Sequence, residues 1–341
     1  MPTAEVALID RSGFPRDKPC ADLLGPDSLR ILDGLGMTGD LDISPSGSLT
    51  RATLDARLLD AAAAAEVEIR TGTEFSGFAD RPSGALVASL RGLSEATSYT
   101  REFDLVVGAD GAYSTVRKAM GIPHPEKSKT HLAIRGYARH TGEGPAPCLP
   151  LDWCDAARPG HGWVVPLDGD TVNVGVFISI PGLRRRRALI PTVLDAYHQD
   201  LVERGYEITA PTQVRSQQVP TAVSRQRLTD PHLPAVLLGD AGAMANPLTG
   251  EGIFYGLSAG VLLADVVALD SATADFQPSR TVQKFEALFR ERFDGHYRRC
   301  MRAARVMQAR WGGGIATRAL AKSPRLRERA LATPTADGSN S

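Results

Sequence analysis

One stretch, residues 233–268, constrains the fold of this chain more than any other. An apolar run of strand length, residues 235–238, ends at Gly239 and Asp240. Small residues and two more glycines then lead into a mostly apolar segment that is long enough for a helix. The pattern predicts a buried strand, a ligand-binding loop and a helix N-terminus, in that order.

These parts suit a ligand that combines a polyol with an electron-rich ring. Glycines let the backbone approach such a ligand, and a helix N-terminus offers unpaired N–H groups and the positive end of its dipole. The carboxylate of Asp240 can accept hydrogen bonds from sugar hydroxyls. We call residues 239–253 the downstream corner.

An upstream corner of the same kind lies about 130 residues earlier. Residues 103–107 predict a strand, Gly108-Ala-Asp110-Gly111 predicts a turn, and a helix is expected from near Ser114. Residues 5–10 predict another short strand, which ends in Asp10. In dinucleotide folds a carboxylate at the end of the second strand accepts hydrogen bonds from ribose hydroxyls, and Asp10 fits that place.

Both corners resemble cofactor motifs. Gly-Asp followed by Asn-Pro-Leu-Thr-Gly-Glu-Gly-Ile is similar to the second FAD-binding motif of the flavoprotein monooxygenase and geranylgeranyl reductase superfamily, and is closest to the reductases. The upstream corner resembles the Asp-Gly motif of the same superfamily. The resemblance implies an α/β fold, an FAD-binding Rossmann-like domain of the glutathione-reductase type with an inserted β-rich substrate domain. It implies FAD contacts at Asp110, Gly111, Gly239, Asp240, Pro247, Gly250, Gly252 and Ile253.

A third resemblance follows the N-terminal strand. Residues 14–20, Phe-Pro-Arg-Asp-Lys-Pro-Cys, are similar to a phrase of geranylgeranyl reductases, which makes Arg16 a candidate FAD contact and Cys20 a candidate active-site residue. Ala21 and Asp22 stand where that family has glycines, so a different pocket shape is expected. A buried, unreactive thiol is the alternative for Cys20.

Two arginines have open interpretations. In the family an arginine just ahead of the next helix reaches toward the cofactor, which implies the same for Arg51. An ion pair beside the helix is the alternative for Arg51, and a structural ion pair is equally open for Arg117 in the upstream corner.

The phosphate-binding fingerprint expected ahead of Asp10 is missing from the sequence. A G-x-G-x-x-G turn normally lies about 20 residues before that carboxylate, yet only nine residues precede Asp10. The first strand and first βα unit would be absent, which would leave residues 6–9 without their central neighbour. An incomplete N-terminus is the favoured explanation and a truncated paralogue the alternative; with the chain as given, weak or lost FAD binding is expected.

Residues 131–222 have the pattern of a β-rich substrate domain, with a hairpin turn at Asp168-Gly169 or Gly169-Asp170. His161-Gly-Trp-Val-Val-Pro resembles the Tyr-x-Trp-x-Phe-Pro phrase of geranylgeranyl reductases, with His161, Val165 and Phe177 as departures from the family pattern. Trp163 is a candidate pocket wall and catalytic-site residue, or else a core aromatic. His161 is a candidate for proton transfer, or else structural.

The remaining boundaries follow from composition. We expect an FAD-binding domain in two parts, residues 1–130 and 223–270. A C-terminal helical region is expected at residues 271–322 and a disordered tail at residues 323–341. Some strands of residues 67–100 can join the substrate sheet. Residues 180–187 are expected as a basic loop, with an anionic lipid or NADPH phosphate as minority ligands. The helix expected over residues 281–311 has one apolar and one basic face, which suits docking on the protein itself or on a membrane surface.

The composition excludes several classes. The 39 basic and 39 acidic residues cancel, so nothing indicates nucleic acid. The four cysteines lack the spacing of a zinc or disulfide framework, and no metal is expected. No run of 18 apolar residues occurs, and we expect a cytoplasmic protein with a possible peripheral membrane contact.

Three functional hypotheses remain. The leading one is an FAD-dependent reductase that transfers hydride from flavin to a C=C bond of an isoprenoid or other apolar substrate, with NAD(P)H as the electron donor. The second is an FAD- and NAD(P)H-dependent monooxygenase that hydroxylates an aromatic or polyketide substrate. The third is a non-catalytic remnant that has lost its cofactor.

Overall fold

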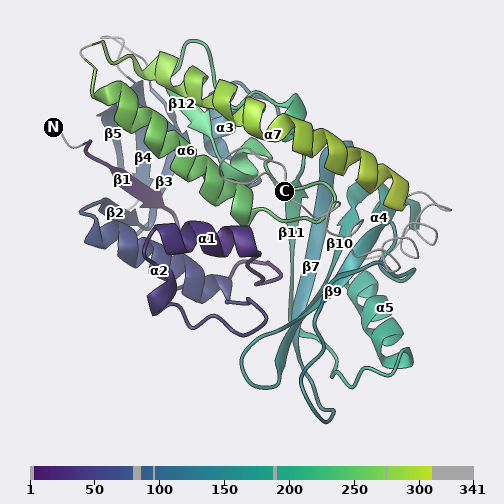
Figure 1. Ribbon diagram of the computed structural model, residues 1–341. Coiled ribbons are helices and arrows are strands. Elements are labelled where there is room, and N and C mark those ends of the chain that lie inside the picture. Colours follow the sequence, from purple (N-terminus) through teal and green to yellow (C-terminus); the bar gives the residue numbers. More distant parts are fainter. Residues whose placement is uncertain (1–3, 80–85, 95–96, 187–189, 274, 309–341) are drawn as a thin grey trace.

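The computed structural model describes residues 4–308, except 80–85, 95–96, 187–189 and 274. The expected tail at 323–341 and the end of the C-terminal helical region, with Trp311, lie outside the described residues. The fold is mixed α/β, as predicted, with a helix-covered part of short strands beside a long antiparallel sheet (Figure 1).

Parallel strands form the helix-covered part. Strand β1 (Ala7–Asp10) pairs with β2 (Glu68–Thr71), and β6 (Val106–Gly108) pairs with β12 (Ala235–Leu237). In the described part of the chain these are two separate two-stranded sheets, so β1 has one hydrogen-bonded neighbour there.

An antiparallel meander joins β3 (Thr73–Phe78), β4 (Leu86–Gly92) and β5 (Ser98–Phe103). Strand β5 was not predicted, because it is a polar edge strand that lacks a clear apolar alternation. The helices of this part are α1 (Pro26–Gly34), α2 (Arg51–Ala64) and α3 (Thr115–Ala119), and single 3₁₀ turns lie at Thr38–Asp40, Lys127–Lys129, Val223–Arg225 and Gly239–Gly242.

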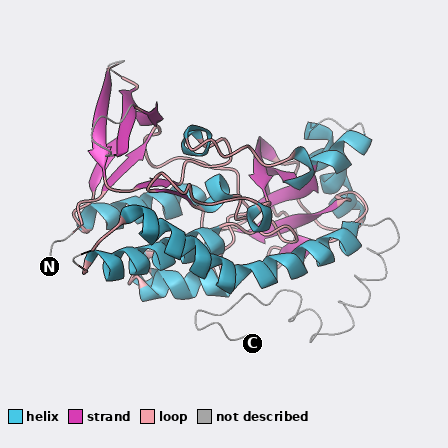
Figure 2. Ribbon diagram, turned by 90° about the horizontal axis from the view of Figure 1, so that it is seen from above, coloured by secondary structure: helices cyan, strands magenta, loops and turns pink. Residues whose placement is uncertain are grey.

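Two long helices, α6 (Ile253–Ser271) and α7 (Pro278–Gln308), run side by side across the molecule (Figures 1 and 2). Helix α6 has the length and mean hydropathy that a membrane span would need, yet its buried face packs in the core with Phe285, Phe289 and Phe293 of α7. Docking of the apolar face of α7 on the protein itself is therefore confirmed.

The long sheet has the strand order β11-β7-β10-β9-β8 and is antiparallel throughout. Its strands are Thr212–Pro220, Thr130–Arg139, Thr171–Ser179, Gly160–Pro166 and Leu149–Asp152. The predicted hairpin between β9 and β10 is confirmed, with Gly169 at φ +61° in the turn. Helix α5 (Ile190–Glu203) packs on one face, where Val172, Val174, Val176 and Ile178 lie. The opposite face, with Trp163 and Phe177, packs against Ala21 and Leu23.

The basic loop expected at residues 180–187 is a wrong prediction. Residues Ile180–Arg186 form helix α4. Proline is compatible with the first turn of a helix, and arginine favours helix. Leu183 packs against the hydrophobic cluster under α5. This tertiary contact stabilises a helix in a segment for which the run of arginines suggested a solvent-exposed loop.

Candidate functional site

The two corners lie next to each other in the fold. Ala235 pairs with Val106 and Leu237 with Gly108 in a parallel register, and the N–H of Leu238 donates to the carbonyl oxygen of Gly108 at 2.9 Å. Because neighbouring parallel strands end at the same sheet edge, both glycine–aspartate turns start from that edge. The structure therefore brings together two motifs that are far apart in the sequence.

Arg117 ties the corners together. Its side chain from α3 is 2% exposed, and Nε donates to the carbonyl oxygen of Ala241 at 2.9 Å. Nη2 donates to the carbonyl oxygen of Asp240 at 3.0 Å. Arg117 thus has a structural role, but through hydrogen bonds to backbone carbonyls of the downstream corner instead of the ion pair considered from the sequence.

Asp110 shapes the upstream corner. Its Oδ2 accepts hydrogen bonds from the N–H groups of Thr115 at 2.7 Å and Val116 at 3.1 Å, at the start of α3. Gly111 has a φ of +84°. The Asp110 carboxylate thus has a structural task at the helix start besides any contact with a ligand.

Asp240 faces a helix N-terminus. Its side chain is 16% exposed, its Oδ2 lies 3.5 Å from Lys18 Nζ, and its Oδ1 lies 3.8 Å from where a Cβ would sit on Gly252. Helix α6 begins at Ile253 without a side-chain cap, so its first N–H groups are available to a ligand.

The loop between Asp240 and α6 is held rigidly. Asn246 Oδ1 accepts from the N–H of Leu248 at 2.8 Å, and Asn246 Nδ2 donates to the hydroxyl of Tyr255 at 2.8 Å. Gly250 has φ +75°, and a Cβ there would meet the ring of Phe177 at 2.9 Å, so this position requires glycine. Pro247 belongs to the same loop. Ile253 packs against the hydrophobic cluster that contains Leu32 of α1 and Leu54 of α2.

The N-terminal candidates also converge. Arg16 lies 3.6 Å from Asp10 and 3.8 Å from Asp55, and Arg51 makes a bidentate pair with Asp55 at 2.8 and 2.9 Å. Asp55, on α2, was missed by the sequence reasoning, although its position four residues after Arg51 was a usable signal. The ion pair considered for Arg51 is present.

The Arg51 side chain is near enough to the Cys20 thiol for the two groups to act on each other's pKa. Burial raises the pKa of the Cys20 thiol, although the positive charge of Arg51 opposes that effect. Cys20 therefore keeps its proton at neutral pH and is not a thiolate nucleophile.

A buried network that the sequence did not predict joins this segment to the long sheet. Asn173 Nδ2 donates to Asp22 Oδ2 and to the carbonyl oxygen of Cys20, each at 2.8 Å. The hydroxyl of Tyr137 donates to Asp22 Oδ2 at 3.0 Å, and the N–H of Arg51 donates to Asp22 Oδ1 at 3.1 Å. Asp22 is 1% exposed and has a φ of +57°. We call Asp22, Tyr137 and Asn173 the interdomain network.

Trp163 is attached to the interdomain network. Its indole Nε1 donates to Asn173 Oδ1 at 2.8 Å, and its side chain is 4% exposed. The ring covers Gly175, where a Cβ would lie 2.0 Å from the indole. Trp163 is thus a core aromatic on the sheet face that packs against Ala21 and Leu23.

These groups fit FAD. Carboxylates at the ends of β1 and β12 can accept from ribose and ribityl hydroxyls, and the uncapped start of α6 can donate N–H groups to an electron-rich ring. Gly34, Gly36 and Gly39 have the spacing of a dinucleotide fingerprint, but Gly34 ends helix α1 and the other two follow that helix. Because no strand precedes them directly, they do not supply the phosphate turn.

Glu251 gives the downstream corner a pH dependence. Its Oε1 lies 3.1 Å from the point where a Cβ would sit on Gly25. Burial raises the pKa of the Glu251 carboxyl to about 7. A raised carboxyl pKa means that the stability it contributes is complete below the unfolded-state value and is lost as pH rises through the folded-state value.

We therefore expect the free energy of unfolding to fall by about 3 kcal/mol more in the wild type than in Glu251→Gln, between pH 4.5 and 7. Urea denaturation at a series of pH values measures this difference. The exposed Glu102→Gln serves as the control and should follow the wild type. Parallel pH profiles of wild type and Glu251→Gln would contradict the assignment.

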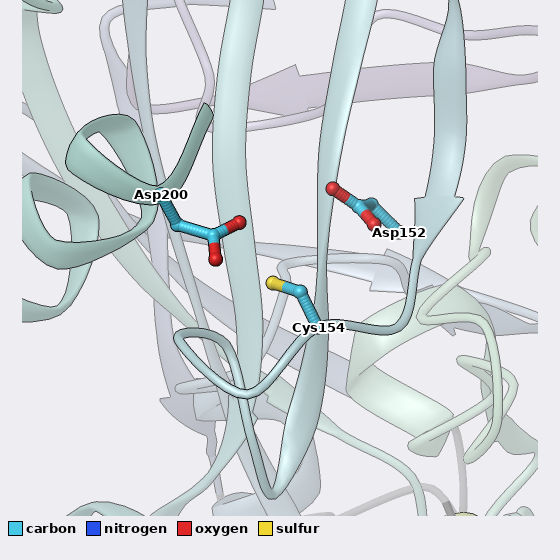
Figure 3. Close-up of side chains that lie close together, drawn as sticks. All are labelled: Asp152, Cys154 and Asp200. Carbon is cyan, nitrogen blue, oxygen red and sulfur yellow. The ribbon is translucent and has the colours of Figure 1, made fainter. Parts of the chain in front are cut away.

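A separate acidic cluster lies under the long sheet. Asp152 at the end of β8, Cys154 in the following loop and Asp200 on α5 place their ligand atoms within 4.8 Å of one another (Figure 3). Arg204 pairs with both carboxylates, at 3.2 Å to Asp152 Oδ1 and 3.0 Å to Asp200, and burial raises the pKa of Cys154 to about 11. The Arg204 guanidinium offsets part of the negative charge of the two carboxylates.

Comparison with known proteins places the fold and the site in context. A family model described as FAD binding domain matches residues 48–270. The menaquinone reductase of Mycobacterium tuberculosis is 30% identical over 295 residues, which cover 77% of this chain and 70% of that protein. The geranylgeranyl diphosphate reductase of Rhodobacter capsulatus is 25% identical over 281 residues, which cover 76% of this chain and 68% of that protein.

Solved structures agree in fold. A geranylgeranyl bacteriochlorophyll reductase-like protein from Thermoplasma acidophilum has a TM-score of 0.74 at 20% identity, covering 89% of this chain and 81% of that one. The OxyS anhydrotetracycline hydroxylase from Streptomyces rimosus has a TM-score of 0.64 at 19% identity, covering 97% and 72%. At these identities the likeness shows the fold alone.

Proposed function

The chain belongs to the FAD binding domain family and is similar to the menaquinone reductase of M. tuberculosis, and from this we propose that it reduces C=C bonds of an isoprenoid or other apolar substrate. It is an FAD-dependent oxidoreductase by family, and its resemblance to geranylgeranyl reductases is confirmed. The observation that supports the proposal is the pair of glycine–aspartate corners on one sheet edge, joined by Arg117.

The chain's own residues have distinct tasks in this proposal. When bound, FAD supplies hydride transfer, which no side chain can perform. Asp10, Asp110 and Asp240 would hold FAD by accepting hydrogen bonds from its hydroxyls, and Arg16 and Arg51 hold the adjacent N-terminal segment through their ion pairs with Asp10 and Asp55. Gly111, Gly239, Pro247, Gly250, Gly252 and Ile253 provide backbone that a ring can approach.

Water exclusion comes from the sheet side. The ring of Phe177, which lies at the Gly250 position of the downstream corner, excludes water from the reacting C=C bond. Cys20 is the candidate active-site residue of the N-terminal segment, and its thiol keeps its proton at neutral pH.

Electron donor and location are further parts of the proposal. NAD(P)H would supply the electrons for the reduction. The enzyme works in the cytoplasm and contacts a membrane surface peripherally, because an apolar isoprenoid substrate partitions into the bilayer. The exposed Arg184 of α4 gives the protein a positive charge toward anionic lipid.

The test begins with the visible spectrum of the purified protein before and after addition of FAD. The reductase proposal expects flavin bands, anaerobic bleaching by NADPH, and recolouring when a prenylated quinone or geranylgeranyl diphosphate is added, with a product that has gained two hydrogens. A product that has gained oxygen would establish the monooxygenase alternative instead. A folded protein that stays colourless with FAD in excess would support the non-catalytic alternative.

A further inference from the structure

Two buried histidines lie on the sheet face that packs against the FAD-binding part. His131 on β7 and His161 on β9 are 6% and 2% exposed, and both contact the ring of Phe177 on β10. The ring centroid of Phe177 lies 4.4 Å from that of His131, in a stacked arrangement, and 5.3 Å from that of His161. Phe177 in turn touches Gly250 of the downstream corner, so the histidines lie one side chain away from that corner.

Each histidine has one nitrogen without a hydrogen-bond partner among the described residues. These atoms are His131 Nε2 and His161 Nδ1. Buried polar atoms in native proteins are almost always paired, so an unpaired one needs an explanation, such as a ligand or a bound water. Two unpaired atoms on a single aromatic wall are a stronger indication than one.

The partners of the other nitrogens determine the chemistry of the free ones. The Thr221 hydroxyl donates to the carbonyl oxygen of Lys129 at 3.0 Å, so it accepts from His131 Nδ1–H, 3.3 Å away. His131 Nδ1 is therefore the donor nitrogen, and His131 Nε2 carries a lone pair. His161 Nδ1 has no partner among the described residues, so in the neutral tautomer with its proton on Nε2 it is free to accept a hydrogen bond from a ligand.

Burial keeps both rings neutral. It lowers the pKa of His131 to about 4, and burial together with the neighbouring His131 lowers the pKa of His161 to about 3. Both lone pairs therefore persist at neutral pH.

We infer that His131 and His161 form a recognition site for a hydroxyl-bearing aromatic ring, such as the hydroquinone or phenol head group of an apolar substrate. Aromatic side chains surround the site, since Trp153 lies 4.9 Å from His161 and Phe177 lies beside both histidines. Such walls suit a planar ring, and the two acceptors select a ring with O–H donors over a ring with carbonyl or ether oxygens. The inference rests on the proposed function, in which this sheet face is the substrate wall.

Isothermal titration calorimetry with 1-naphthol and 1-methoxynaphthalene tests the inference without turnover, because these probes differ in one O–H donor. We expect the wild type to bind 1-naphthol about tenfold more tightly than the ether. His131→Phe and His161→Phe should each reduce this preference several-fold, and the double variant should abolish it. The control His198→Phe, which removes a histidine on α5 bonded to the Ile208 carbonyl, should keep the preference.

Thermal melting of the ligand-free protein separates recognition from a structural role. Each phenylalanine variant loses an unpaired buried acceptor but also a ring N–H donor, such as that of His131 to Thr221, so only small changes in melting temperature are expected. Equal binding of the two probes would overturn the inference. Lower melting temperatures with an unchanged naphthol preference would also overturn it, and would indicate that the two nitrogens hold a bridging water only.

FAD titration of the same variants tests whether the two histidines contribute to cofactor binding instead. Loss of FAD affinity with an unchanged naphthol preference would assign the histidines to the cofactor and overturn the inference. If the naphthol preference behaves as expected while the reductase assay fails, recognition stands and only the proposed reaction fails.

Discussion

Replacing Arg117 by methionine is expected to lower the free energy of unfolding by about 3–5 kcal/mol and to weaken FAD binding by at least tenfold. The guanidinium is buried and donates to the Asp240 and Ala241 carbonyl oxygens. Methionine leaves the Ala241 carbonyl without this donor, whereas the Asp240 carbonyl keeps only the N–H of Ala243. A charged hydrogen bond contributes about 1.5–3 kcal/mol, and here several are lost together. Urea denaturation and equilibrium FAD titration measure the two effects.

Two variants complete the Arg117 experiment. Arg117→Lys keeps the charge but cannot reach two carbonyls with a planar fork, so an intermediate loss of both quantities is expected. Arg91→Met removes an exposed arginine paired with Glu74 on the meander and should change stability by only about 0.5 kcal/mol. A folded Arg117→Lys protein with wild-type FAD affinity would show that the corners do not act together.

Replacing Asp22 by alanine is expected to cost about 3–5 kcal/mol of unfolding free energy. The change removes the acceptor of the Tyr137 hydroxyl and of the Arg51 N–H, and it removes one of the two acceptors of Asn173 Nδ2. Because Asn173 also orients the Trp163 indole, the fluorescence of the folded variant should shift. Chemical denaturation followed by fluorescence measures both effects.

Asp22→Gly separates backbone strain from the lost hydrogen bonds. Asp22 has a φ of +57°, where glycine is about 1 kcal/mol more favourable than alanine. Asp22→Gly should therefore be more stable than Asp22→Ala by about that amount and still less stable than the wild type. If Asp22→Ala were as stable as the wild type, the interdomain network would not hold Cys20 and Trp163 in place.

The corners could be predicted from sequence because their chemistry is local. A strand, a glycine, an aspartate and a helix start follow one another within about ten residues in each corner, and parallel strands end at a shared edge. The role of Arg117 was not predictable, because its acceptors are backbone carbonyls 123 and 124 residues away. Every residue has a backbone carbonyl, so the sequence does not show which one will accept a hydrogen bond.

The interdomain network was out of reach for a related reason. Asp22 meets Tyr137 and Asn173 across separations of 115 and 151 residues, and only the folded sheet brings them to one point. The substitution of Asp22 for a family glycine indicated a change of pocket shape, but not a buried carboxylate with three donors. Helix α4 shows the opposite error, since a run of arginines suggested solvent and contact with the core produced a helix.

The central claim is that both corners hold one flavin, and hydrogen exchange measured by mass spectrometry at increasing FAD concentrations tests it most directly. We expect the amides of residues 108–116 and 239–256 to gain protection together, with the same dependence on FAD concentration, while those of α5 stay unchanged. Protection of one corner without the other, or of neither at saturating FAD, would contradict the claim.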